Sequence, residues 1–137
     1  MTIKQIILPL LLIMATGAHA APDIQEGSWE VVAQVYMPGL PIKIPPITYS
    51  QCITQKDLVP KKVQQRGDCK INNINISANT VSWEMVCNTE AGQLNGEGNV
   101  TYQKTSFAGS FKMAMPGPKG TMTMTTNMQG HYQGPCQ

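Results

Sequence analysis

Charged side chains are scarce in this sequence, and their signs nearly cancel. Aspartate, glutamate, lysine and arginine make up 13% of the 137 residues, with ten basic side chains against eight acidic ones. The basic residues form no stripe and the acidic residues form no block. The charge pattern therefore gives no support for nucleic acid as a partner, and we expect none.

The residue types that enzymes and zinc sites use most are also few. The chain has two histidines and four cysteines. Only His131 lies beyond residue 20, and no two cysteines have Cys-x-x-Cys spacing. A zinc site of the usual spacing, thiol redox chemistry and a nucleophile–base pair all lack candidate residues. The sequence predicts neither an enzyme nor a bound cofactor.

One apolar run is present near the N-terminus, and it is short. It covers residues 6–15, whereas a helix that spans a bilayer needs about 20 apolar residues. Lys4 precedes the run and an Ala-x-Ala triplet follows it at 18–20, which is the pattern of an export signal and its cleavage site. We predict a signal peptide over residues 1–20 and a single domain over residues 21–137. That domain would have no membrane anchor and would lie in the periplasm or be secreted.

Alternation of apolar and polar residues is the strongest structural signal. Between 81 and 87, Trp83 and Cys87 fall on an apolar face and Glu84 on the polar face, as in a half-buried strand. We expect the other strands to be arranged around this one. Similar strands are predicted at 29–37, 47–53, 69–76, 94–102, 107–115 and 121–132.

These strands recur at short intervals that are separated by turn residues, and helix signals are nearly absent. The pattern predicts an all-β fold, an antiparallel meander of about seven strands that forms a curved sheet, a sandwich or a partly closed barrel. The one exception is Thr54-Gln55-Lys56-Asp57, which resembles a capping box and predicts one short helical turn before Pro60.

An even number of cysteines in an exported chain indicates disulfides. If residues 77–79 form a three-residue turn, Cys69 lies directly opposite Cys87, which suits a cross-strand bridge. The remaining pair is then Cys52 with Cys136. The apolar phase shifts between 71 and 74, which suggests a bulge, and a bulge would move this register by one residue.

Two further hairpins have registers that can be worked out from their turns. A two-residue turn at 104–105 places Gly98 opposite Phe111 and Gly96 opposite Met113, and large residues opposite glycines favour such a pairing. If the turn at 116–120 is equally tight, it pairs the methionines of two strands and makes a patch of four thioethers: Met113, Met115, Met122 and Met124. Thioethers select Cu(I) or Ag(I), although methionines also simply fill irregular cores.

Several short motifs occur in an order that is similar to a known family. They include Gly27-Ser28-Trp29-Glu30, Met37-Pro38-Gly39 and a final Gly134-Pro135-Cys136, with Cys69, Trp83, Cys87 and a Tyr102-x-x-x-x-Phe107-x-Gly109 step between them. The chain resembles the domain-of-unknown-function 3617 family of small exported bacterial proteins. The resemblance implies a periplasmic or secreted protein with paired cysteines, and it implies no catalytic residue.

Taken together, the sequence predicts a non-enzymatic, disulfide-bonded β-domain that binds a small apolar ligand or a partner protein. A curved sheet with glycines can enclose a cavity. The residues expected to line that core or cavity are Trp29, Trp83, Phe107 and Phe111. The alternative function is binding of Cu(I) or Ag(I) by the methionine-rich hairpin.

The signal peptide and the disulfides predict the mass of the mature protein. After export, the intact denatured mass should correspond to a chain that starts at Ala21 and is about 4 Da lighter than its reduced form, because two disulfides remove four hydrogens. Mass spectrometry before and after reduction measures both values. A mass that retains residues 1–20, or no change on reduction, would contradict the prediction.

Overall fold

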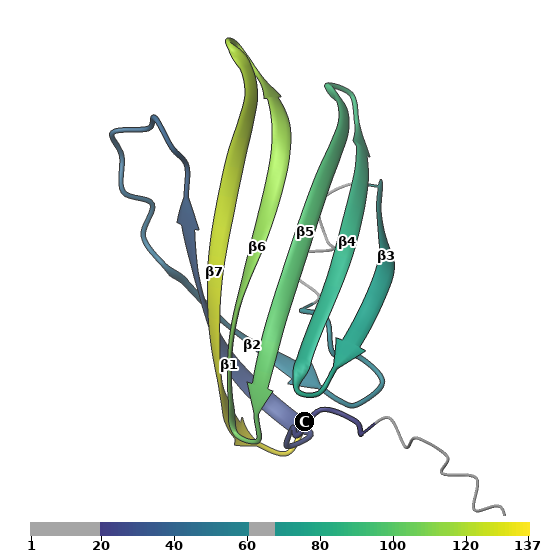
Figure 1. Cartoon of the computed structure of the whole chain (residues 1–137). Coiled ribbons are helices and arrows are strands. Elements are labelled where there is room, and N and C mark those ends of the chain that lie inside the picture. The colour runs from purple at the N-terminus through teal and green to yellow at the C-terminus, as the bar shows by residue number, and fades with distance from the viewer. Residues whose placement is uncertain (1–19, 61–67) are drawn as a thin grey trace, which may run out of the picture.

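Seven antiparallel strands make up the fold. The computed structural model describes residues 20–60 and 68–137, and this part of the chain contains no helix (Figure 1). The strands are β1 (Gly27–Tyr36), β2 (Ile47–Ile53), β3 (Asp68–Ser77), β4 (Thr80–Thr89), β5 (Gly92–Gln103), β6 (Ser106–Gly117) and β7 (Gly120–Gly134). The predicted all-β class and number of strands are confirmed. Across these same ranges, no helix is long and apolar enough to cross a membrane.

All seven strands belong to one sheet, in the order β2-β1-β7-β6-β5-β4-β3. The strands from β3 to β7 form a meander, and the β1–β2 hairpin joins it because β1 pairs with β7. Of the predicted shapes, the curved sheet is confirmed, and the sandwich is wrong because all seven strands belong to one sheet; β2 and β3 remain separate edges, so the sheet does not close into a barrel. Strand β4 lies next to the β3 edge, so the expectation that it is central was also wrong.

The segment after β2 is a turn and not the predicted helical turn. The backbone N–H of Asp57 donates to the carbonyl of Thr54 at 3.0 Å, which closes a single four-residue turn. Leu58, Val59 and Pro60 that follow are all buried.

Aromatic rings cover glycines on the concave face of the sheet. A Cβ atom at Gly98 would overlap the ring of Trp83, and a Cβ at Gly96 would overlap that of Phe111. The two rings stack, with centroids 6.5 Å apart and planes 8° from parallel. The predicted pairing of Gly98 with Phe111 and of Gly96 with Met113 is confirmed. The Phe111 ring leans diagonally to cover Gly96.

A second aromatic group connects β1 to the rest of the core. Trp29 has no exposed surface, and its ring centroid lies 6.3 Å from that of Tyr102, 5.6 Å from that of Phe107 and 6.0 Å from that of Tyr132. Its Nε1–H donates to the carbonyl of Gln25 at 3.0 Å. The indole therefore joins the N-terminal segment, β1, β5, β6 and β7 in one packed unit.

Two disulfides hold the edges of the sheet. Cys69 and Cys87 are directly opposite across β3 and β4, and Cys52 of β2 is bonded to Cys136 near the C-terminus. These are the pairs expected from the sequence. In the loop-entropy description the shorter bridge contributes about 3 kcal/mol and the longer one about 4.5 kcal/mol. Two such bridges indicate an oxidising, non-cytoplasmic environment.

Cys69 lies opposite Cys87 as expected, but the structure differs from the prediction at two places in the β3–β4 hairpin, and their effects on the register cancel. Ser77 pairs with Thr80, so the turn has two residues and not three, and a bulge between Asn72 and Asn75 shifts the register back by one. The left-handed residue of the turn is Ala78, with φ of 50°, and not Asn79, although asparagine is the residue type that more often adopts this conformation. The side chain of Asn79 instead accepts a hydrogen bond from the backbone of Asp23 at 2.9 Å.

A buried tyrosine generates a prediction about stability at high pH. The Tyr102 hydroxyl donates to the carbonyl of Leu58 at 2.6 Å, and burial, together with the Asp57 carboxylate, raises the pKa of Tyr102 far above its ordinary value. Because the fold favours the neutral phenol, its stabilising effect is present below the ordinary pKa of about 10 and is lost as the pH rises further.

Replacement of Tyr102 with phenylalanine should lower the unfolding free energy at pH 7 by about 1–3 kcal/mol, because the Leu58 carbonyl loses its donor. The difference in unfolding free energy between this variant and the wild type should narrow above about pH 10. At that pH the unfolded wild type is stabilised by the ionisation of Tyr102, and phenylalanine has no group that ionises. Urea unfolding at pH 7 and at about pH 11 measures both effects. Tyr36→Phe, at an exposed position, is the control and should change neither value; an equal Tyr102→Phe difference at both pH values would contradict the prediction.

Candidate functional site

The concave face of the sheet has a closed half and an open half. In the closed half, the aromatic rings described above fill the space between the strands. The β1–β7 pairing ends where Tyr36 meets Thr125, so the first residues of β7, 120–124, have no strand beside them on that side. The β1–β2 loop diverges from β7 at this point, as seen at the upper left of Figure 1. The open half of the concave face lies at this end.

A hollow that we name the methionine slot lies between this loop and the β6–β7 hairpin. Its volume is about 350 Å³. Met37, Pro38, Gly39 and Leu40 of the loop form one wall. The residues of the β6–β7 hairpin that form the other wall are Met115, Pro118, Lys119, Gly120, Thr121, Met122, Thr123 and Met124. Thioethers and hydrocarbon supply most of this lining, and it includes no carboxylate or imidazole.

The methionines of the hairpin are paired as the sequence suggested. Met113 lies opposite Met124, and Met115 lies opposite Met122. They do not all have the same surroundings, because Met113 packs against the core cluster and does not line the slot. Met37 was not among the candidate residues, yet it is the fourth methionine of the slot. No local pattern connects it with the hairpin, because only the β1–β7 pairing brings the loop there.

The four aromatic residues that were predicted to line a core or cavity all lie in the closed half. Trp29, Trp83, Phe107 and Phe111 are each no more than 3% exposed, and none of them lines the methionine slot. In this structure they are part of the buried core. Any contact that they make with a ligand stays a prediction.

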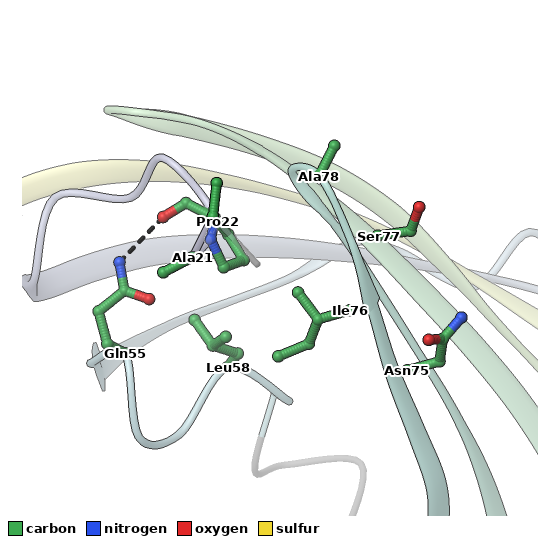
Figure 2. A pocket seen from close by; sticks show the side chains of 9 residues that line it. Ala21, Pro22, Gln55, Leu58, Asn75, Ile76, Ser77 and Ala78 are labelled. Atoms are coloured by element: carbon green, nitrogen blue, oxygen red, sulfur yellow. Dashed lines mark hydrogen bonds between the residues drawn. The ribbon is translucent and has the colours of Figure 1, made fainter. Parts of the chain in front are cut away.

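A larger groove lies elsewhere, between the N-terminal segment and the end of β3 (Figure 2). It measures about 740 Å³. Figure 2 shows Gln55 reaching across to the N-terminal segment, where its Nε2–H donates to the carbonyl of Pro22 at 2.9 Å. Leu58 and Ile76 supply its apolar surface. None of the side chains that line this groove ionises, so they offer contact surface but no acid, base or charge.

The convex face is polar. Glu84 and Glu97 are opposite each other on β4 and β5, and Asn73 donates from its Nδ2 to the Glu84 carboxylate at 2.6 Å. Lys112 lies opposite Glu97 on β6. Within residues 20–60 and 68–137, no three side chains among histidine, cysteine, aspartate and glutamate gather into a metal-binding group. This face has the mixed charge of a solvated surface.

One row on the convex face has the residue types of a hydrolase triad. His131 of β7 lies opposite Ser106 on one side and opposite Glu30 on the other. Sequence reasoning missed this row because the β1–β7 pairing is not set by any local turn. In the described structure, however, no hydrogen bond joins the three side chains, His131 and Glu30 are exposed, and none of the three lines a described hollow. A triad needs the base bonded to both partners beside a substrate site.

Comparison with known proteins gives one match. The family described as "Protein of unknown function (DUF3617)" matches residues 24–136. No curated protein and no solved structure matches the chain.

The triad-like row leads to a prediction. The mature protein should hydrolyse p-nitrophenyl acetate and butyrate no faster than its Ser106→Ala variant, because the serine lacks a bonded base and an oxyanion site. Spectrophotometric assays of both proteins at pH 7–8 measure this. Activity above background that disappears with Ser106→Ala and with His131→Ala would contradict it.

Proposed function

The chain belongs to the DUF3617 family, and we propose that it is a non-enzymatic binding domain of the periplasm or of the secreted fraction. Its ligand is a small molecule with an apolar chain, which is held in the methionine slot. One observation carries the proposal. The apolar concave face continues past the closed core onto the β6–β7 hairpin, where no strand or aromatic ring of the described residues covers it.

Two features support the location. The two disulfides need an oxidising compartment to form. Residues 1–20 have the composition of an export signal.

The lining and size of the slot support an apolar ligand. Small-molecule sites usually measure about 300–1,000 Å³ and are mainly apolar, with a few polar groups that fix orientation. The slot is at the lower end of that range, at about 350 Å³. Met115 and Met124 are half-buried and Met122 is 43% exposed. A bound chain would remove this apolar surface from water, which favours binding by about 25 cal/mol for each Å² covered.

The single charge in the lining favours a particular head group. Lys119 is exposed at the β6–β7 turn, beside Pro118 and Gly120. No acidic side chain is among the lining residues. An amphipathic anion would place its chain along the methionines and its charged end near the ammonium group, so we propose a fatty-acid-like ligand.

A non-enzymatic role is supported by the state of the possible catalytic groups. All four cysteine sulfurs are in disulfides, so no thiolate is available as a nucleophile. The methionine slot itself contains no group that transfers a proton near neutral pH, since Lys119 is its one ionisable residue.

A partner protein is the second candidate. Leu40 and Ile42 of the β1–β2 loop are 51% and 72% exposed. The loop is also held in place, because Gln34 donates from Nε2 to the carbonyl of Ile44 at 2.6 Å. A fixed, exposed apolar loop is a surface that a partner protein can cover.

Binding of an anionic fluorescent fatty acid tests the proposal. Dansyl-undecanoic acid should bind the mature, oxidised protein with an increase and a blue shift in dansyl emission. Met122→Glu should weaken binding by about tenfold or more, because a carboxylate in the slot must lose water and repels the anionic probe. Fluorescence titration gives both dissociation constants.

Gln129→Glu is the matched control for charge. Gln129 is exposed on the opposite face of the same strand, so this variant should bind the probe like the wild type. Circular dichroism establishes that both variants fold. Absence of saturable binding, or equal binding by Met122→Glu and the wild type, would reject the small-ligand proposal and favour the partner protein.

A further inference from the structure

We propose that the methionine slot is also a binding site for a soft monovalent metal ion, Cu(I) or Ag(I). Its ligands would be the thioether sulfurs of Met37, Met115, Met122 and Met124. The inference does not depend on the fatty-acid-like ligand, although both use the same hollow.

The placement of the four methionine residues is the first argument. Met115 and Met122 are directly opposite on β6 and β7, and residues in such positions have Cβ atoms about 4.5–5.5 Å apart. Met124 follows Met122 by two residues, so both side chains point to the same face of the sheet. Met37 approaches from the loop on the other wall. Methionines from three chain segments therefore line one hollow, and their side chains are flexible.

The chemistry of the lining is the second argument. Thioethers are soft donors that bind Cu(I) and Ag(I), whereas divalent ions such as Zn²⁺ and Mg²⁺ prefer nitrogen, thiolate or charged oxygen ligands. The slot contains no carboxylate, imidazole or free thiol. Lys119 adds a positive charge, which opposes a divalent ion more than a monovalent one. The lining therefore favours a soft monovalent ion over a hard or divalent one.

The difference between these methionines and the others is the third argument. Met85 and Met128 are each 1% exposed and pack within the core, which is the ordinary use of methionine as a filler. Met37, Met115 and Met124 are only half-buried, and Met122 is exposed. Core filling explains Met85 and Met128, and it also explains Met113, which is half-buried but packs against the core cluster. It leaves the slot methionines unexplained. Sulfurs that reach solvent can meet an incoming ion.

Titration of the mature, oxidised protein with metal tests the inference. Ag(I) is added as silver nitrate in chloride-free buffer, and Cu(I) as its acetonitrile complex under argon with bicinchoninate as competitor. We expect one ion per chain, no binding of Zn²⁺ at the same concentrations, and shifts of the ¹³C-labelled methionine methyl resonances of the slot. The resonances of Met85 and Met128 should not move.

Replacement of all four slot methionines with leucine should weaken Cu(I) and Ag(I) binding by about 100-fold or more, because leucine keeps the shape but has no donor atom. The double variant Met85→Leu/Met128→Leu is the matched control and should bind like the wild type. Met113→Leu should also have little effect, which separates the slot from a site made by the hairpin alone.

The fatty-acid probe distinguishes the two proposals. The four-leucine variant keeps an apolar slot, so it should still bind dansyl-undecanoic acid while it loses the metal. Unchanged metal affinity in that variant, or metal-dependent shifts at His131 without shifts of the slot methyl groups, would overturn the metal site. If the four-leucine variant does not fold, Met122→Leu at the exposed position and the wild-type methyl shifts give the same decision.

Discussion

The packing of aromatic rings on glycines is the contact on which this sheet depends. No helix in the described residues covers either face, so the sheet must bend to bury its own side chains. Trp83 lies over Gly98, and Phe107 lies over Gly130. A side chain at either glycine would push the ring away from the strand, and well-packed cores tolerate such overpacking poorly. Because the rings lie this close to the backbone, one curved sheet, with Ile24, Leu58 and Val59 packed against it from outside the strands, encloses a core that usually needs a second layer.

The open half of the concave face follows from where this packing stops. Beyond Phe111, the next residues on the same face of β6 are Met113 and Met115, and the residues opposite them on β7 are also methionines and not aromatic residues. Pro38 also follows soon after β1 ends at Tyr36, and proline cannot donate to the ladder. The loop therefore turns away from β7 and leaves its first residues without a neighbouring strand. The slot exists because the β1–β7 pairing ends at Thr125 and the aromatic packing ends at Phe111, which lies opposite the neighbouring Thr126.

The sequence predicts the strands well and the long-range pairings poorly. Alternation identifies all seven strands, and the tight turns give the methionine and glycine registers. The β3–β4 cysteine pair was reached with a wrong turn length, because the bulge at Asn72–Asn75 compensates. The pairing of β1 with β7 is set by the burial of Trp29 among distant rings, so no local pattern contains it. Met37 in the slot and the row at His131 both depend on that pairing, and both were missed for this reason.

The presence of sulfur in the slot distinguishes two physical roles for one surface. An apolar chain needs only hydrocarbon, and leucine would provide the same buried area without a reactive atom. A thioether on the surface of a protein in an oxidising compartment is exposed to conversion into a polar sulfoxide, which would weaken apolar binding. Apolar binding alone therefore explains the shape of the slot but not its composition. A soft metal ion accounts for the composition, because the electron pair that makes the sulfur oxidisable is the same pair that binds the ion.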